Sequence, residues 1–99
     1  MAKKEIVWSS LAEIQFQTIL EFYWNRNENS NYSLKFLNEV EDLLEIISNT
    51  AHIGRLTSNK FTRVIPLKTY LIFYDVHIDR IEIVSFWDNR QDLERRKIK

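Results

Sequence analysis

The hydrophobic pattern changes its period at Gly54, which is the only glycine in the 99-residue chain. Before this glycine, apolar residues recur every three or four positions, which is the spacing of one face of a helix. After it come short runs rich in β-branched and aromatic residues, which are typical of strands. Because the helical and strand-like patterns are separated along the chain, the sequence predicts an α+β domain.

The first half of the chain predicts a short strand followed by a helical hairpin. Residues 4–8 (KEIVW) form a β-prone run, and Ser10 with Glu13 has the spacing of a capping box that starts a helix over 11–26. A polar break over 25–31 separates this helix from a second one. Two helices joined by a short loop are expected to pack antiparallel. The apolar stripe of the second helix consists of Phe36, Val40, Leu43, Leu44 and Ile47.

The second half predicts three strands over 61–66, 70–78 and 80–87, and their connections are short enough for an antiparallel meander. Both faces of the last strand are partly apolar, which favours a central position in the sheet. The fold class is therefore α+β, a two-helix N-terminal hairpin packed on an antiparallel β-sheet in the order β-α-α-β-β-β. The first strand is free to pair beside the last. We expect a single domain over 1–99, of which 88–99 form a charged C-terminal tail.

Several kinds of chemistry are excluded by composition. The chain has no cysteine, so disulfides, thiolate catalysis and cysteine metal sites are ruled out. One glycine cannot supply a phosphate-binding loop, and His52 and His77 stand alone in the sequence, so we expect surface or packing roles for both. We therefore expect no cofactor and no metal. No apolar run has the length of a signal peptide or of a membrane span, which indicates a cytoplasmic protein.

The net charge of zero conceals an asymmetry between the halves of the chain. Residues 1–51 hold four Lys/Arg against eight Asp/Glu, whereas residues 52–99 hold ten against six. Such a split suggests a basic working surface for an anionic partner. The alternative is ordinary solvated charge with no common face.

A cluster of aromatic and polar residues lies where the last predicted strand ends. Phe86 and Trp87 run directly into Asp88, Asn89 and Arg90. An aromatic platform beside a guanidinium can stack a base and hold a phosphate. The same residues can equally anchor the last strand, with Trp87 in the core and the polar groups fixing the turn.

The whole chain resembles the toxins of the RelE/ParE superfamily, which belong to type II toxin–antitoxin (plasmid stabilisation) systems. The resemblance is carried by the ordered set of segments rather than by any one of them. It covers the Trp-Ser-Ser-Leu-Ala-Glu entry to the first helix, Ile53-Gly54-Arg55, and the strand Tyr70-Leu71-Ile72-Phe73-Tyr74. The most specific piece is Phe86-Trp87-Asp88-Asn89-Arg90-Gln91-Asp92, after which Leu93 stands where relatives commonly have proline.

This resemblance implies a toxin held inactive by a cognate antitoxin, with one of two targets. The ParE-like branch inhibits DNA gyrase and needs no catalytic residues. The RelE-like branch is a metal-independent endoribonuclease that cleaves messenger RNA on the ribosome with basic residues and an acid/base group. Many ribonuclease members carry an arginine three residues before the tyrosine that ends the central strand, and here that position is Leu71. Because leucine cannot clamp a phosphate, we favour the gyrase branch.

The candidate residues of the active surface are taken from the sheet and the start of the tail. Trp87 is expected to support them by packing or stacking, and Arg63, Tyr70 and Trp87 are expected on the face of the sheet that the helices leave open. The antitoxin is expected on the outer side of the hairpin and on an exposed sheet edge. The candidates are Arg63, Lys68, Tyr70, Asp88, Asn89 and Arg90.

Two alternatives of other classes remain open at this point. One is a non-toxic interaction module that binds an antitoxin and nothing else. The other is a general RNA-binding domain that uses Tyr70, Trp87 and the basic run over 95–97, and it predicts strongly salt-dependent binding.

Overall fold

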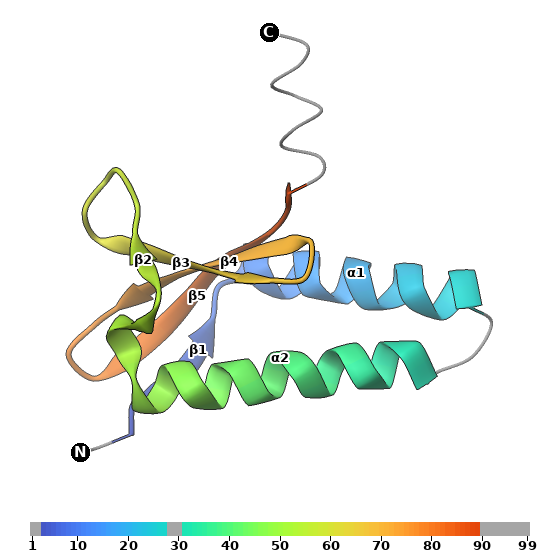
Figure 1. Ribbon diagram of the computed structural model, residues 1–99, viewed down its shortest axis with the longest axis horizontal. Coiled ribbons are helices and arrows are strands. Elements are labelled where there is room, and N and C mark those ends of the chain that lie inside the picture. The colour runs from blue at the N-terminus through green and yellow to red at the C-terminus, as the bar shows by residue number, and fades with distance from the viewer. Residues whose placement is uncertain (1–2, 28–30, 90–99) are drawn as a thin grey trace, which may run out of the picture.

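Two long helices and five strands follow one another in the predicted order (Figure 1). The computed structural model describes residues 3–27 and 31–89. Its elements are β1 (Glu5–Trp8), α1 (Ser10–Asn27), α2 (Asn31–Asn49), the 3-10 helix η1 (Ala51–Ile53), β2 (Arg55–Leu56), β3 (Thr62–Leu67), β4 (Tyr70–Val76) and β5 (Arg80–Asp88).

The first helix starts one residue earlier than predicted. Ser9 is its N-cap, since the Ser9 Oγ accepts a hydrogen bond from the Ala12 amide at 3.0 Å. The predicted capping box of Ser10 with Glu13 is therefore wrong, because Ser10 is already the first helical residue. Ser9 is fixed by the sheet: its amide donates to the Ile83 carbonyl at 3.0 Å and its Oγ to the Val84 carbonyl at 2.8 Å.

The second helix is amphipathic, and its predicted stripe faces the core. Leu43 is half-buried, whereas the other stripe residues are almost completely buried. Near the start of α2, the Ser33 Oγ donates to the Leu20 carbonyl of α1 at 3.0 Å, which ties the two helices together. Near its end, the Ser48 Oγ donates to the Lys4 carbonyl just before β1. The helical hairpin and the first strand therefore form one packed unit.

The sheet has the strand order β1-β5-β4-β3-β2. The predicted antiparallel meander is confirmed for β3, β4 and β5, and β5 has the central position that its two partly apolar faces indicate. The first strand lies beside β5, as its sequence allowed, but it runs parallel, so the sheet is mixed. A parallel neighbour is possible because the whole helical hairpin serves as the long connection that parallel strands require. The two-residue strand β2 was not predicted, because it is too short to show a period.

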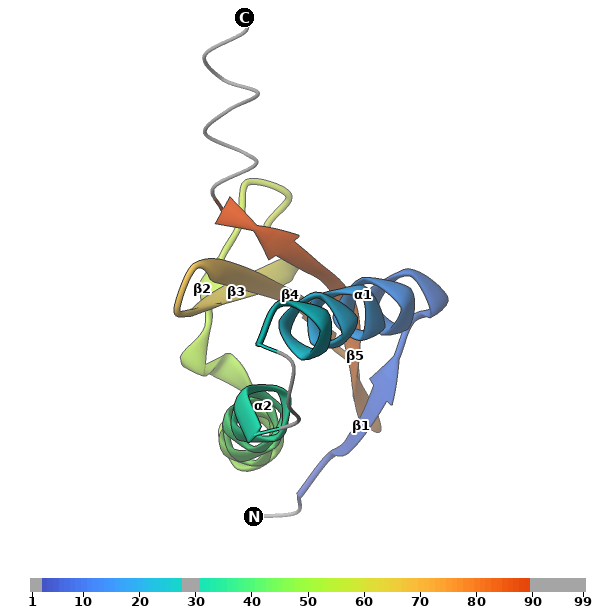
Figure 2. The same cartoon turned by 90° about the vertical axis from the view of Figure 1, so that its right-hand side faces the viewer.

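The core lies between the helical hairpin and one face of the sheet, which we call the helix face (Figure 2). Trp8 stacks between the rings of Phe16 and Phe86, with centroids 5.2 and 5.5 Å away, which joins β1, α1 and β5. The sheet contributes to this core Tyr70, Ile72, Tyr74, Ile81, Ile83 and Phe86.

None of the helices in the described part of the chain is long and apolar enough to cross a membrane.

Candidate functional site

The face of the sheet opposite the helices has an apolar centre. Residues that pair directly across antiparallel strands point to the same face. The pairs Val64 with Phe73 and Leu71 with Trp87 therefore lie on this second surface, which we call the open face. A groove of about 640 Å³ runs over these four residues, with Arg55, Leu56, Thr57 and Ser58 along its other wall.

Arg63 lies on the helix face, and its predicted position on the open face is wrong. Its register partner is Tyr74, which is completely buried in the core. The Arg63 Nη1 donates to the Gly54 carbonyl at 2.6 Å and to the His52 carbonyl at 3.3 Å. These bonds tie β3 to the segment that leaves η1, so the guanidinium serves as a link within the fold.

Tyr70 also lies on the helix face, in contrast to its predicted exposure. Only 2% of its surface is exposed. Its hydroxyl lies 2.8 Å from the Tyr23 hydroxyl of α1, and its ring lies 5.3 Å from the ring of Phe36. The reason is the register of β4, in which Tyr70 points to the same side as the buried Ile72.

Lys68 occupies the tight turn between β3 and β4. Its backbone has a φ of 57°, which places a side chain in the left-handed region at the first position after β3. Its Nζ lies 3.4 Å from the Glu39 Oε1 of α2, and its side chain is 43% exposed. Lys68 therefore combines a turn position with an exposed ion pair to the helical hairpin.

The structure brings most of the remaining candidates to one end of the sheet. Asp88 pairs in register with Tyr70, and the Asn89 amide donates to the Thr69 carbonyl at 2.8 Å. The end of β5 and the turn that carries Lys68 therefore lie side by side. Arg90 lies outside the described residues, so its predicted position has no counterpart in the structure.

A polar joint that was not predicted closes the other end of the core. The Tyr74 hydroxyl donates to the Ala51 carbonyl at 2.9 Å and accepts from the Gly54 amide at 2.8 Å. Burial raises the pKa of Tyr74 above its ordinary value, against smaller lowering effects of the Gly54 amide and of Arg63. A Cβ on Gly54 would lie 2.6 Å from the Tyr74 hydroxyl oxygen, so only glycine fits this position. The isolated glycine after the second helix was the one sequence signal of this joint.

Residues 6–93 match the family described as ParE toxin of type II toxin-antitoxin system, parDE. The chain belongs to this family of toxins. The predicted membership of the RelE/ParE superfamily is thus confirmed.

The fold of the toxin has a solved counterpart. A structure titled "Chromosomal ParDE TA system from P. aeruginosa" superposes with a TM-score of 0.72 at 14% sequence identity, over 87% of this chain and 96% of the other. At this identity the likeness concerns the fold alone. No curated protein matches the toxin in sequence.

The basic excess of the second half is not spread over the sheet of the toxin. Residues 52–89 hold five Lys/Arg against four Asp/Glu, whereas residues 90–99 hold five against two. Most of the excess therefore belongs to the C-terminal segment beyond the described residues. The predicted basic surface does not extend over the described sheet, where Arg63 is turned inward and Lys68 is paired.

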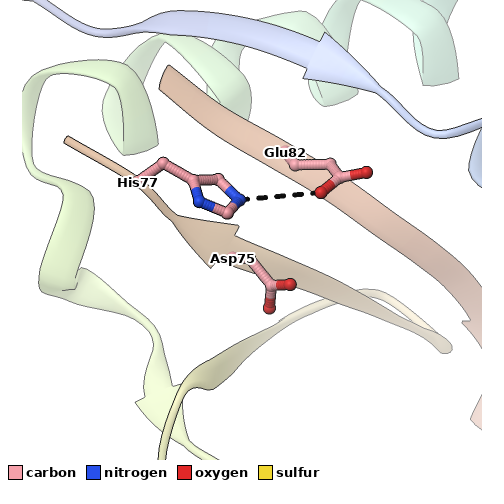
Figure 3. Close-up of side chains that lie close together, drawn as sticks. All are labelled: Asp75, His77 and Glu82. Atoms are coloured by element: carbon pink, nitrogen blue, oxygen red, sulfur yellow. Dashed lines mark ion pairs between the residues drawn. The ribbon is translucent and has the colours of Figure 1, made fainter. Parts of the chain in front are cut away.

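His77 of the toxin is less isolated than the sequence suggests. It lies near two carboxylates, those of Asp75 and Glu82, at the β4–β5 hairpin (Figure 3). His52, in contrast, belongs to η1 and is exposed. The groups around His77 are the residues in the described part of the toxin whose geometry suits a metal ion.

Proposed function

We propose that this ParE family member arrests bacterial growth by inhibiting DNA gyrase without a catalytic step, and that its cognate antitoxin neutralises it. The observation that carries the proposal is the open face. The position at which many ribonuclease relatives have an arginine is Leu71, and it lines an apolar groove with Val64, Phe73 and Trp87.

Metal-free cleavage of RNA needs cations aimed at the phosphate and a group that transfers a proton. Among the described residues, the predicted candidates have other partners. Arg63 donates to two backbone carbonyls, and Lys68 pairs with Glu39. Tyr70 is buried against α1, away from the open face. These contacts weaken the ribonuclease alternative and favour a toxin that acts by binding.

The target-binding residues are proposed to lie where β5 leaves the sheet. Asp88 and Asn89 end this strand, Arg90 follows, and the basic excess of the chain continues over 91–99. Charged groups at the rim of an interface steer association and select partners, which suits a segment that follows an apolar face.

The test compares two assays on the same purified protein. In a supercoiling assay with purified gyrase, the toxin is expected to inhibit, and in cell-free translation the messenger RNA is expected to remain intact. New messenger RNA ends within ribosome-occupied codons would refute the gyrase proposal and restore the ribonuclease branch. Inhibition in neither assay would leave only an antitoxin-binding module.

A matched pair of arginine variants locates the active segment. Arg90→Ala is expected to lose gyrase inhibition with an unchanged melting temperature. Arg80→Ala is the control, because Arg80 is paired with Asp79 at 2.9 Å, next to the β4–β5 turn. If Arg90→Ala loses its cooperative melt, the residue is structural and the assignment is wrong. In growing cells, expression of the toxin should stop growth, and coexpression of the antitoxin should restore it.

A further inference from the structure

The hairpin of β4 and β5 brings one imidazole and two carboxylates together (Figure 3). Asp75 and Glu82 are direct register partners, so their side chains stand next to each other on the open face. His77 follows Asp75 by two positions, and its Nε2 lies 3.6 Å from the Glu82 Oε1. The three ligand atoms all lie within 4.8 Å of one another.

This cluster lacks an internal counter-charge. Two carboxylates directly opposite each other on a sheet repel and destabilise the pairing. The nearby cations have other partners: the Lys4 Nζ donates to the carbonyls of His77 and Ile78 at 2.9 and 2.6 Å, and Arg80 pairs with Asp79. No lysine or arginine in the described part of the chain forms an ion pair with either carboxylate.

The imidazole shows a second, independent sign of a missing partner. The Nε2 of His77 has almost no contact with solvent, and within the described residues it has no hydrogen-bond partner. A buried polar atom without a partner is costly and calls for a water or an ion. This nitrogen points toward the carboxylate of Glu82, whose side chain is 37% exposed, so the space between them is accessible to a solvent-borne ion.

We propose that Asp75, His77 and Glu82 bind a divalent transition-metal ion of the zinc type. One imidazole and two carboxylates form a ligand set that zinc accepts, with a further position left for water. In a tetrahedral zinc site with bonds near 2.0–2.1 Å, the ligand atoms lie about 3.3 Å apart. Small side-chain rotations therefore suffice to close the site.

Neighbouring groups hold the ligands in place. The Thr62 Oγ1 donates to the Asp75 Oδ1 at 2.6 Å, which orients the carboxylate as outer-shell partners of metal ligands do. The ring of Phe61 packs edge-on against the imidazole, with centroids 5.8 Å apart. The His77 amide donates to the Arg80 carbonyl at 2.8 Å and closes the hairpin. Bound metal would neutralise the two carboxylates and fasten β4 to β5, independently of how the toxin acts on its target.

The test is titration of the tag-free, full-length protein with zinc chloride, followed by calorimetry and by the imidazole NMR signals. The chain has two histidines and no cysteine, so the background is small. We expect one zinc per chain, a shift of the His77 signals and no shift of the His52 signals. His77→Gln should abolish binding, and His52→Gln should leave it unchanged.

Two further variants separate ligation from a general loss of structure. Glu82→Gln keeps the size of the side chain and should weaken zinc by about 100-fold, and Thr62→Val should weaken it by about tenfold. All variants should give the far-ultraviolet circular dichroism of the parent without metal. The proposal is overturned if the parent binds no zinc, if His77→Gln binds as well as the parent, or if His52→Gln is the variant that loses binding. In each of these cases, the cluster is an ordinary ion pair of His77 with Glu82.

Discussion

Replacing Tyr74 by phenylalanine tests whether the polar joint at Gly54 stabilises the fold. Tyr74→Phe keeps the buried ring and removes only its hydroxyl. That hydroxyl satisfies two backbone groups, the Ala51 carbonyl at 2.9 Å and the Gly54 amide at 2.8 Å. Both groups belong to the short segment between α2 and β2, so their bonds to β4 hold this segment against the sheet.

The expected loss follows from the two groups that the variant leaves without a partner. An unsatisfied buried donor or acceptor costs about 1–3 kcal/mol. Gly54 is buried, so its amide is expected at the upper end of this range. Ala51 is half-buried, so water can reach its carbonyl at a lower cost. Together they give a loss of about 2–4 kcal/mol in the free energy of unfolding, from a total of about 5–15 kcal/mol.

The assay is urea unfolding at neutral pH, with a thermal melt as a second readout. For a domain of this size, the loss corresponds to a drop of about 10–25 °C in melting temperature. Tyr32→Phe is the control, because Tyr32 is 44% exposed and its variant should stay within about 0.5 kcal/mol of the parent. A loss below about 1 kcal/mol for Tyr74→Phe would refute the reasoning, since it would mean that the two bonds contribute little or that water replaces them.

The same joint gives two more predictions. Gly54→Ala places a Cβ 2.6 Å from the Tyr74 hydroxyl oxygen, so we expect a loss of about 1–3 kcal/mol in urea unfolding, and an unchanged stability would show that the ring moves aside freely. Burial raises the pKa of Tyr74 in the folded state, so its contribution is fully present below the unfolded value near 10 and is lost as the pH rises through the folded value. The stability gap between the parent and Tyr74→Phe should therefore narrow above about pH 10 in urea titrations, and a gap that stays constant to the alkaline limit would contradict the raised pKa.

The order of the elements was predictable because their periods differ. The stripe from Phe36 to Ile47 repeats at helical spacing, and three of its four buried members have at most 1% of their surface exposed. The meander followed from three β-prone runs with short connections. The N-cap was placed one residue late because Ser9 and Ser10 are both acceptable caps, and only the hydrogen bonds of Ser9 to β5 decide between them.

The assignment of faces failed where both faces of a strand are apolar. In β4, Tyr70 and Ile72 alternate with Leu71 and Phe73, so the pattern gives two apolar sides and does not tell which one the helices cover. The error about Tyr70 follows from this ambiguity. It extends to Arg63, whose face is fixed by its pairing across β3 and β4.

Side-chain clusters that depend on strand register were also beyond the sequence. His77 appeared isolated because its partners are the residue two positions earlier and Glu82 on the next strand. A register shift between Phe73 and Tyr74 changes how the two strands face each other. Without knowledge of that irregularity, counting along the chain cannot assign the pairs on both sides of it.

The way in which the fold uses its polar groups has a consequence for the mechanism. The guanidinium of Arg63 and the hydroxyls of Tyr70 and Tyr74 are all spent on joints between the sheet and the helical part of the chain. The centre of the open face is left to aliphatic and aromatic side chains such as Leu71. Such a surface gains free energy by being covered, whereas phosphate chemistry requires cations that point outward. The division of labour between the two faces therefore favours a toxin that acts by occupying its target.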